Sequence, residues 1–350
     1  MMDSDLETPA MNRKRHATIA EIARLAGVGT ATVDRVLHNR GTVRETTRQR
    51  VEQARAAIER GAPMSPRARP WRLKVLLPEL AGASTEHLGR CLQACGERGN
   101  ATVECVFARK MEPAALARKL RACAGQGIDA VAFQALEDPR VHDAVDFLHG
   151  ARIPALALLS GLSNRNIIAT VGIDNRAAGR TAGFLMGRLT RQAGRVAIVT
   201  AGSLYRLHED REMGFRAALR AGFPHIGESI VLNGEDDGTR NFTVVSEALS
   251  RYPDLVGIYN VGGGHEGVVR ALKEAGVVGE LIHIGHNFSQ ETRSYLLDGS
   301  MDIVLHLDMH NVAEHAVEAM VAHLEQRQRD PGVLPIGIVT RENTAGLAYS

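Results

Sequence analysis

The first sixty residues carry apolar positions at helical spacing, interrupted by one tight turn. Thr18 and Glu21 stand three residues apart in the pattern of a capping box, so a helix is predicted to start at Thr18. Its apolar stripe consists of Ile19, Ile22, Ala23 and Ala26. Gly27 suits the left-handed position that ends such a helix. The pattern therefore predicts a short helix followed by a turn.

A second short helix is predicted to start at Gly29 or Thr30, after Val28 enters the core. Its inward residues are Val33, Val36 and Leu37. A third helix is predicted from about Thr46 to Arg60, with Val51, Ala54 and Ile58 as its buried stripe and with Arg48, Arg50 and Arg55 as basic residues. Two short helices around a tight turn are typical of a helix-turn-helix, whose second helix lies in the major groove of DNA.

The outward face of the second helix carries side chains that suit base recognition. They are Thr30, Ala31 and Arg35, with Thr32 and Asp34 beside them. An arginine pairs with guanine through two hydrogen bonds, and threonine and alanine methyls contact the thymine methyl. The alternative is a plain three-helix bundle with a solvated basic face. The agreement between the helix signals and the local basic charge favours the DNA reader.

From Leu73 onward, short apolar runs alternate with amphipathic stretches. Strands are predicted at Leu73–Pro78, Ala130–Gln134, Ala155–Leu159, Arg195–Thr200, Gly257–Asn260 and Leu281–Gly285. Helices are predicted at Ala114–Ala124, Ala177–Thr190, Arg211–Ala221 and Glu266–Ala275. This β-α-β series predicts an α/β fold with parallel sheets covered on both faces, and with the working site at the carboxyl ends of the strands.

Charge is unevenly distributed along the 350 residues, a length that exceeds one ordinary domain of about 100 to 200 residues. Residues 1–72 contain 14 Lys and Arg against 8 Asp and Glu, whereas the remainder contains 28 against 32. A basic surface attracts nucleic-acid phosphates through counterion release. A basic nucleic-acid-binding head and a mildly acidic body are expected.

Metal, cofactor and membrane chemistry are not expected. The four cysteines contain no C-x-x-C pair, and no histidine cluster stands near them at zinc spacing. No run of eighteen apolar residues occurs, and no apolar segment follows the charged stretch Met1–Arg15. These observations predict a cytoplasmic protein without a metal site.

A proline-rich connector separates the two parts. Residues 61–72 contain three prolines, which marks a linker and not a helix interior. Two alternatives stay open for it: a flexible basic tether, or insertion of Arg67, Arg69 and Arg72 into a narrow minor groove.

Polar residues cluster just after the predicted strands, where they can converge on a ligand. The stronger candidates are Asp174, Asn175, Arg211, Asn260 and Asn287. Amides and an arginine fork suit vicinal hydroxyls or a carboxylate. Weaker candidates, for which a surface loop or turn-capping role is an equal alternative, are Gln134, Glu137, Ser160, Tyr205, His208 and His286.

One glycine motif suggests a dinucleotide site. Gly262-Gly-Gly-His-Glu-Gly267 fits G-x-G-x-x-G after a strand. It follows a late strand, however, and the next strand ends in His286-Asn287 without a carboxylate for a ribose. We interpret it as a turn that opens a helix, and no catalytic triad, nucleophile elbow or P-loop is found.

The N-terminal motif resembles the LacI family of repressors. The family signature is similar to A-G-V-S-x-x-T-V-S-R-V-L-N, and this chain reads Ala26-Gly-Val-Gly-Thr-Ala-Thr-Val-Asp-Arg-Val-Leu-His38. The resemblance implies base reading by Thr30, Ala31 and Arg35. The DNA-binding residues expected from the residues and the resemblance together are Thr18, Thr30, Ala31, Thr32, Arg35, His38 and Arg48. The chain departs from the signature at Gly29, Asp34 and His38, and the linker lacks the hinge leucine that the family wedges into the minor groove.

The remainder resembles type I periplasmic sugar-binding proteins. The resemblance is carried by Gly172-Ile-Asp-Asn-Arg-Ala-Ala-Gly179, His208-Glu-Asp-Arg-Glu-Met-Gly-Phe215 and Gly257-Ile-Tyr-Asn260. It implies two lobes that close on a ligand, with Arg211 as the ligand-binding arginine and Asn260 as the hydroxyl-binding amide. Asn287 stands where an Asp is frequent, and Leu307 where some sugar binders have Gln.

Together, these expectations predict the domain organisation of the chain. A helix-turn-helix domain is expected over residues 1–62, a linker over 63–72 and an effector-binding domain over 73–350. The lobes of the last are expected to span approximately 73–172 plus 309–328, and 173–308 plus 329–350. The expected ligand residues are Gln134, Ser160, Asp174, Asn175, His208, Arg211, Asn260 and Asn287.

The hypothesis for function is a transcription regulator, a repressor, of a carbohydrate uptake or catabolism operon. It would bind a palindromic double-stranded operator as a homodimer or higher oligomer, because one reader covers half a site. A small sugar, polyol or sugar acid between the lobes would control it. The alternatives are a solute-binding protein, which the basic head disfavours, and an NAD-dependent α/β enzyme based on the glycine motif; no enzymatic activity and no cofactor are expected.

Overall fold

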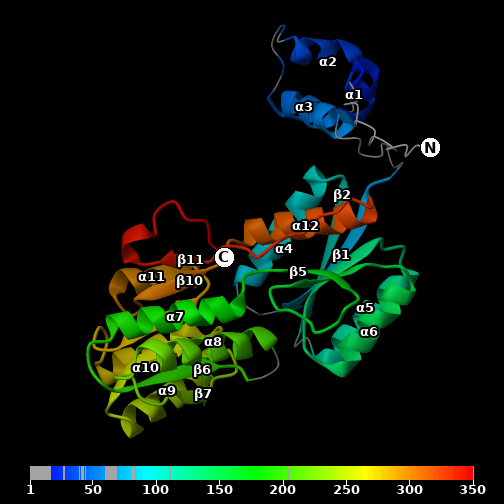
Figure 1. Ribbon diagram of the computed structural model, residues 1–350. Coiled ribbons are helices and arrows are strands. Elements are labelled where there is room, and N and C mark those ends of the chain that lie inside the picture. Colours follow the sequence, from blue (N-terminus) through cyan, green and yellow to red (C-terminus); the bar gives the residue numbers. More distant parts are fainter. Residues whose placement is uncertain are drawn as a thin grey trace, which may run out of the picture. The chain divides into compact units, whose positions relative to one another are not determined.

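The computed structural model describes residues 17–26, 28–38, 40, 43, 45–59, 69–79, 83–109, 112–202 and 205–349. The chain divides into two compact units, an N-terminal unit over residues 1–69 and a C-terminal unit over residues 70–350 (Figure 1). The predictions for Gly27 and for the linker arginine Arg67 fall outside the described residues.

The N-terminal unit contains helices α1 (Ile19–Ala26), α2 (Thr30–Leu37) and α3 (Glu45–Glu59). The capping box before α1 is confirmed, because the amide of Glu21 donates to the Thr18 hydroxyl at 3.3 Å and the Thr18 amide donates to the Glu21 carboxylate at 3.0 Å. The core of the unit consists of Ile22, Ala23, Ala26, Val33, Val36, Val51, Ala54 and Ile58. The predicted helical stripes therefore meet one another.

One residue of the predicted stripe was placed wrongly. Ile19 keeps 37% of its surface exposed, whereas Ile22 is fully buried. Ile19 is the first residue of α1. Ile19 is not part of the buried core of the unit, so the apolar stripe of α1 extends beyond its buried face.

The first lobe of the C-terminal unit is built on a five-stranded parallel sheet in the order β2-β1-β3-β4-β5. Its strands are β1 (Trp71–Glu79), β2 (Ala101–Arg109), β3 (Ala130–Gln134), β4 (Ala155–Leu158) and β5 (Ile167–Val171). Its helices are α4 (Ala83–Arg98), α5 (Pro113–Ala122), the 3₁₀ turn η1 (Cys123–Gly125), α6 (Pro139–Gly150) and α12 (Met309–Leu324).

Two separate apolar clusters cover the two faces of this sheet. Leu88 and Leu92 of α4 pack with Val312 and Ala316 of α12 on one face. Leu116 of α5 and the buried residues of α6 cover the other. Burial of this kind contributes about 25 cal/mol per Å² of apolar surface, and it holds every strand between two helical layers.

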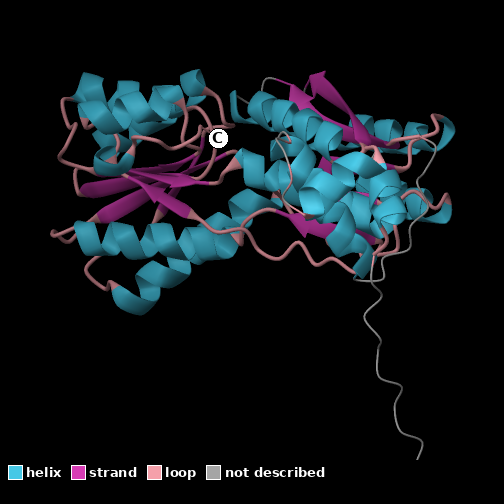
Figure 2. Ribbon diagram, turned by 90° about the horizontal axis from the view of Figure 1, so that it is seen from above, coloured by secondary structure: helices cyan, strands magenta, loops and turns pink. Residues whose placement is uncertain are grey.

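The second lobe is built on a six-stranded sheet in the order β11-β10-β9-β8-β6-β7, parallel except for β11. Its strands are β6 (Arg195–Thr200), β7 (Ile230–Asn233), β8 (Leu255–Asn260), β9 (Ile282–His286), β10 (Ile303–His306) and β11 (Gly337–Val339). Its helices are α7 (Asn175–Leu189), α8 (Arg206–Gly222), α9 (Gly238–Arg251), α10 (His265–Ala275), α11 (Gln290–Asp298) and the 3₁₀ turn η2 (Arg341–Asn343). Figure 2 shows this sheet, on the left, between layers of helices. The expected α/β fold with two parallel-sheet lobes is thus observed, and α12 returns from the second lobe to the first.

The end of the predicted linker needs correction. Trp71 and Arg72 belong to β1, where the Arg72 amide donates to the Asp129 carboxylate at 2.8 Å and the Arg72 carbonyl accepts from the Asp129 amide. The strand begins earlier than the apolar run because paired backbone groups, and not apolar side chains, hold its first residues. Arg72 is therefore part of the C-terminal unit.

Helices α7 and α8 pack unusually closely because glycines face each other. A Cβ on Gly179 would lie 2.0 Å from the Arg211 carbonyl oxygen, and one on Gly214 would lie 2.1 Å from the Arg176 carbonyl oxygen. Only residues without a Cβ allow this approach. The contact fixes the position of α8, and with it the side chains of His208 and Arg211.

Among the described residues, no helix is long and apolar enough to span a membrane. In the same part of the chain, no group of three or more His, Cys, Asp or Glu side chains is arranged to hold a metal ion.

Candidate functional site

The exposed face of α2 carries the predicted base-reading residues. Thr30, Ala31 and Arg35 are exposed and Thr32 is half-buried. Val33 and Val36, buried on the opposite face, anchor the helix to the core. Gly29 precedes the helix with an extended backbone and without a capping side chain. The amino end of α2 therefore presents small side chains and backbone N–H groups, which suit close approach to DNA.

Two of the predicted DNA contacts also have partners within the N-terminal unit. His38 Nδ1 lies 2.9 Å from Asp34 Oδ1, one helical turn earlier. The Thr18 hydroxyl donates to Glu21 at 2.8 Å while it accepts from the Glu21 amide. Arg48, on the first turns of α3, is half-buried. The carboxylate of Asp34, a departure from the family signature, is thus paired with an imidazole on its own helix.

In the C-terminal unit, the carboxyl ends of the strands carry buried polar atoms that have no hydrogen-bond partner among the described residues. They include Gln134 Oε1 at the end of β3, Ser160 Oγ just after β4, and His208 Nδ1 on α8. Ser160 is fully buried and His208 is 4% exposed. An unsatisfied buried polar atom costs about 1 to 3 kcal/mol, so folded proteins rarely retain one without a purpose. A bound ligand would supply the missing partners.

A chain of hydrogen bonds connects the two lobes at this place. Leu159, with a φ of 63°, adopts a left-handed backbone that is rare for a leucine. Its carbonyl accepts from Asn175 Nδ2 at 3.0 Å, and Asn175 Oδ1 accepts from Arg211 Nε at 2.9 Å. Arg211 Nη1 in turn donates to the Val261 carbonyl at 2.6 Å. Strained backbone of this kind occurs where surrounding structure enforces it, often at ligand sites.

Arg211 is buried at the centre of this chain. Burial lowers the pKa of its guanidinium, while Tyr259 and Asp236 act in the opposite direction. Nε and Nη1 are committed to Asn175 and Val261, and within the described part of the chain Nη2 has no hydrogen-bond partner. Arg211 therefore retains a terminal donor in a region of low polarity, where a hydrogen bond to a ligand is strong.

His208 and Asp236 form a second polar pair beside Arg211. His208 Nε2 lies 3.7 Å from Asp236 Oδ2, and the Gly263 amide donates to Asp236 Oδ1 at 2.9 Å. Burial lowers the pKa of His208 to about 4, although the Asp236 charge raises it. The imidazole is therefore neutral at neutral pH.

Asp236 was not among the predicted site residues. It follows β7 in Gly234-Glu-Asp-Asp237, so an acidic residue after a strand was the available signal. Both Glu235 and Asp236 have left-handed backbones, with φ of 58° and 55°. That conformation, which the sequence does not indicate, turns the Asp236 carboxylate toward His208 and Gly263.

Three more predicted ligand residues lie in the second lobe, and the side chains of two of them, Asn260 and Asp174, have partners there. Asn260 Nδ2 donates to the Gly263 carbonyl at 2.9 Å and to His265 Nδ1 at 3.0 Å, and Asn260 Oδ1 accepts from the Gly262 amide. Asp174 caps α7 by accepting from the Ala177 amide at 2.8 Å. Asn287 has a φ of 68° and is half-buried. Of these three, Asn260 has both ends of its amide occupied by the loop that follows β8.

The glycine motif after β8 is accounted for by packing. Gly264, with a φ of 68°, precedes α10, and a Cβ on Gly267 would lie 1.9 Å from the Gly238 carbonyl oxygen. These positions require glycine for backbone shape and for the contact between α9 and α10. The interpretation as a turn that opens a helix agrees with this geometry.

The weaker candidates divide into two groups. Tyr205 packs against the apolar cluster of the first lobe, and its neighbour Arg206 reaches the Ser163 hydroxyl and lies 3.7 Å from Glu137 Oε2. These contacts join the lobes. His286 Nε2 instead lies 2.8 Å from the buried Tyr259 hydroxyl, and the tautomer of the imidazole decides which of the two donates. Burial lowers the pKa of His286 well below its ordinary value.

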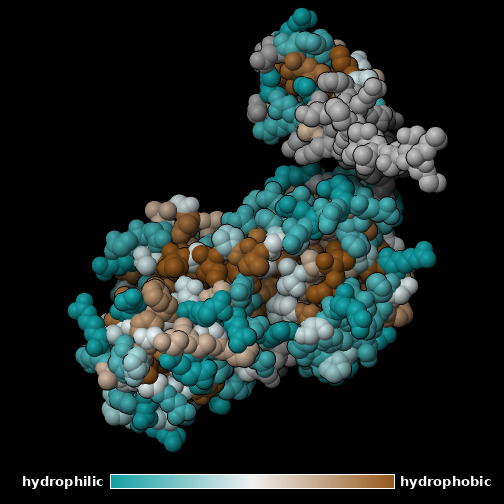
Figure 3. Space-filling model, in the orientation of Figure 1, coloured by the Kyte–Doolittle hydropathy of each residue, from teal (hydrophilic) through white to brown (hydrophobic). Residues whose placement is uncertain are grey.

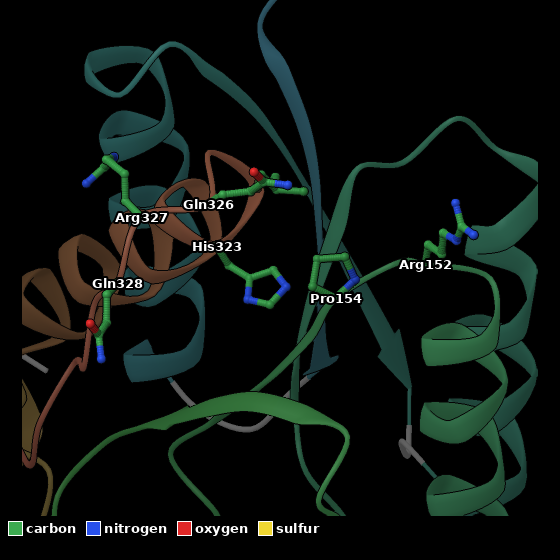
Figure 4. A pocket seen from close by; sticks show the side chains of 7 residues that line it. Arg152, Pro154, His323, Gln326, Arg327 and Gln328 are labelled. Carbon is green, nitrogen blue, oxygen red and sulfur yellow. The ribbon is translucent and has the colours of Figure 1, made fainter. Parts of the chain in front are cut away.

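Two open surface pockets lie away from these residues. One, of about 510 Å³, is lined by Arg152, Pro154, His323, Leu324, Gln326, Arg327 and Gln328 (Figure 4). Pro154 directly precedes β4, so this pocket lies at the amino edge of the sheet, opposite to Ser160. Figure 4 shows that the Arg152 and Arg327 side chains point away from one another. The other, of about 500 Å³, lies on the outer surface of α7 and α8. Neither contains a convergent polar set like that around Arg211.

Comparisons with known proteins agree with the division into two units. Residues 18–59 match the family model described as bacterial regulatory proteins, lacI family. Residues 88–328 match the model described as periplasmic binding protein domain. Neither description is that of an enzyme family. No curated protein sequence matches the chain.

Solved structures share the fold of the C-terminal unit. GanP, a glucose-galactose binding protein from Geobacillus stearothermophilus, gives a TM-score of 0.74 at 18% identity, covering 79% of this chain and 99% of its own. An ABC transporter solute binding protein from Burkholderia graminis, solved with D-arabinose, gives 0.74 at 21%, covering 81% and 99%. A sugar-binding protein of a Bacillus halodurans sugar ABC transporter gives 0.70 at 22%, covering 78% and 99%.

The family matches, the helix-turn-helix and the two parallel-sheet lobes lead to one assignment. The chain belongs to the periplasmic binding protein domain family, and it joins that domain to a DNA-binding module of the lacI family of bacterial regulatory proteins.

Proposed function

We propose that this protein is a cytoplasmic transcription regulator that binds a specific DNA operator through its N-terminal unit and a small carbohydrate between the lobes of its C-terminal unit. The observation that carries the proposal is the coexistence, in one chain, of an exposed helix-turn-helix face and a buried interlobe set of unsatisfied polar atoms. A transport protein would use the second feature alone.

In the DNA arm of the proposal, Thr30, Ala31 and Arg35 read base edges while Thr18, Thr32, His38 and Arg48 position the unit on phosphates. The exposure of the first three on α2, with Thr30 and Ala31 at its amino end and Arg35 in its last turn, supports this division. Arg35 is the strongest specificity determinant among them, because a guanidinium can bind guanine through two hydrogen bonds.

In the effector arm, Gln134 and Ser160 of the first lobe and His208 and Arg211 of the second contact the carbohydrate. Asn175 holds Arg211, and Asp174, Asn260 and Asn287 shape the loops around the site. Solute-binding proteins with the same fold that were solved with D-arabinose or named for glucose and galactose support a sugar as the ligand.

The protein is proposed to act as a homodimer on a palindromic operator. A single reader contacts only half a site, and a two-fold protein matches a two-fold sequence. Exposed apolar side chains of the second lobe include Leu297 of α11, Ile338 of β11, and Leu347 and Tyr349 of the C-terminal segment. Figure 3 shows apolar residues on this face of the second lobe. Such a surface suits contact with a second copy.

A gel-shift assay of the full chain against its own upstream DNA, with and without a panel of sugars, tests the proposal. We expect specific binding that competitor DNA does not remove and that one sugar class strengthens or weakens by about 5- to 150-fold. Specific binding unaffected by any carbohydrate would refute the effector arm. Absence of specific binding under every condition would refute the regulator, and melting shifts with the same sugars would then indicate a solute-binding protein.

A further inference from the structure

The unsatisfied atoms between the lobes have a chemical polarity that limits the ligand. Gln134 Oε1 is an acceptor only, whereas Ser160 Oγ both donates and accepts. Neither atom has a hydrogen-bond partner in the part of the chain that the structure describes, and Ser160 is fully buried. At least one hydrogen-bond donor of the ligand must therefore meet the first lobe.

His208 adds a second acceptor from the other lobe. Its neutral ring has one N–H, and Nε2 faces the Asp236 carboxylate at 3.7 Å. The negative charge of Asp236 favours the proton on Nε2, which leaves the lone pair on the buried and unsatisfied Nδ1. His208 is therefore poised to accept a proton-bearing group of the ligand.

The charges around the site balance one another. Arg211 contributes a buried cation, and Asp236 contributes a carboxylate near enough to affect the pKa of Arg211. The Gly263 amide holds one Asp236 oxygen in place at 2.9 Å. A ligand carboxylate would gain the guanidinium but would also meet the Asp236 charge and the two acceptor atoms of Gln134 and His208.

On the basis of the proposed function, we infer that the site accepts uncharged polyhydroxy ligands and rejects sugar acids, with His208 as the specificity-determining hydroxyl acceptor and Asp236 as the residue that positions it. Hydroxyl groups both donate and accept, so one ligand satisfies Gln134 and His208 as acceptors and Arg211 Nη2 as a donor. Where a carboxylate takes the place of a ligand hydroxyl beside Gln134 or His208, it supplies no donor to that acceptor, which stays unsatisfied.

Matched ligand pairs measured by isothermal titration calorimetry on the full chain test this inference. The probes are galactose with galacturonate, glucose with glucuronate, and glucitol with gluconate. In the pair that binds, we expect the affinity of the neutral sugar to exceed that of its acid by about tenfold or more. A difference of this size is the effect of leaving a buried acceptor unpaired. An acid that binds more tightly than its neutral partner overturns the inference and leaves the proposed function standing. If no member of any pair binds, both the inference and the carbohydrate arm of the proposed function fail.

Substitutions separate the two roles. His208→Leu is expected to weaken the neutral ligand by roughly 5- to 150-fold, whereas His208→Asn, with an amide oxygen near the place of Nδ1, retains most of the affinity. His310→Leu, at an exposed position of α12, is the control and leaves affinity unchanged. Equal affinities of His208→Leu and the parent protein would overturn the role of His208.

Asp236→Asn is expected to strengthen the binding of the sugar acid, a gain that damage to the structure would not produce. The amide keeps an oxygen for the Gly263 N–H but removes the charge that opposes Arg211. We expect the ratio of neutral to acid affinity to fall by about tenfold, through stronger binding of the acid. An unchanged ratio in a variant that still binds the neutral ligand would overturn the positioning role of Asp236.

Discussion

At the scale of single residues, the DNA-reading face depends on one long side chain among small ones. Arg35 is exposed, and its backbone carbonyl accepts from the Arg40 amide just beyond the helix, at 2.8 Å. Thr30 and Ala31 contribute short side chains at the amino end of the same helix. Small residues bring α2 close to the bases, and Arg35 then provides the directional hydrogen bonds.

Substituting Arg35→Ala is expected to reduce specific operator affinity by roughly 5- to 150-fold, because a bidentate contact to guanine contributes about 1 to 3 kcal/mol of discrimination. Affinity for unrelated DNA should fall much less, since phosphate contacts are retained. Fluorescence anisotropy with operator and scrambled duplexes at one fixed salt concentration measures both. Arg118→Ala, at an exposed site on α5, is the charge-matched control. Equal losses on both duplexes would show that Arg35 contacts phosphate only.

Individual site residues were partly predictable from the sequence. Arg211 and Asn175 were expected just after strands; Asn175 starts α7, whereas Arg211 lies inside α8, and the structure brings their side chains together at 2.9 Å. Asn260 was expected to face a ligand, but the glycine loop after β8 occupies its amide. Asp236 was missed, since its orientation depends on two consecutive left-handed residues. Sequence pattern indicates which polar groups end a strand, whereas loop conformation decides where they point.

At the scale of elements, six of the seven strands inside the two sheets were predicted, whereas no edge strand was. The exception is β10, which is central and buried but was not predicted. Ala130–Gln134 and Arg195–Thr200 were predicted with the observed bounds of β3 and β6, because both are continuous apolar runs covered on two faces. The strands β2, β5 and β7 lie at sheet edges. Their partly exposed residues interrupt the apolar run, so periodicity alone did not reveal them.

The α7–α8 contact gives a prediction at this scale. Gly179→Ala would place a Cβ 2.0 Å from the Arg211 carbonyl oxygen, so the helices must separate. We expect a loss of about 1 to 3 kcal/mol in the free energy of unfolding, as for overpacked cores, together with weaker ligand binding because Arg211 moves. Gly222→Ala at the end of α8 is the matched control. Apart from its chain neighbours and its own helix backbone, no atom of the described residues lies within 4 Å of its added Cβ, so stability should be equal or slightly higher. Urea unfolding compares the variants, and identical midpoints for Gly179→Ala and the parent would contradict the packing argument.

At the scale of the whole molecule, buried histidines make stability depend on pH. Burial lowers the pKa of His208 and of His283 to about 4, and that of His265 to about 3. In the unfolded chain their pKa is near 6.5, so below that pH the unfolded state binds protons that the folded state does not. Stability is therefore complete above about pH 6.5 and falls as the pH decreases toward 4, by at most about 1.4 kcal/mol per pH unit for each histidine.

Thermal unfolding between pH 8 and pH 5 measures this dependence. We expect the melting temperature to be nearly constant from pH 8 to 7 and to decrease from pH 6.5 to 5. His283→Asn removes one titrating ring while it keeps a donor toward the Ser300 carbonyl, so its decrease should be shallower. His310→Asn, at an exposed position, should reproduce the parent profile. A melting temperature that does not change between pH 7 and 5 would rule out the proposed linkage.

The contacts between the lobes indicate how a ligand would be sensed. Arg206, at the start of α8, reaches the Ser163 hydroxyl and Glu137 of the first lobe, while Tyr205 packs on the apolar cluster beside them. Glu137 also accepts from the Ser163 amide at 3.1 Å and lies 2.8 Å from His142 Nε2. Glu137 is thus held in place by contacts within the first lobe, and Arg206 is the second lobe's part of the contact.

Removing this contact is expected to favour the open state. Arg206 keeps 42% of its side chain exposed, so the contact contributes about 0.2 to 1 kcal/mol, and Arg206→Ala should weaken ligand binding by at most about fivefold. The direct measurement is the distance between spin labels at exposed positions of the two lobes, Arg118→Cys on α5 and Glu247→Cys on α9. Without ligand, Arg206→Ala should lengthen or broaden the distance distribution, and saturating sugar should restore it. Arg220→Ala, exposed near the other end of α8, should leave it unchanged. If Arg206→Ala gives the parent distribution, the contact follows closure without stabilising it, and the other contacts between the lobes, among them Tyr205 on the first-lobe cluster and Asn175 on the Leu159 carbonyl, must hold the lobes together.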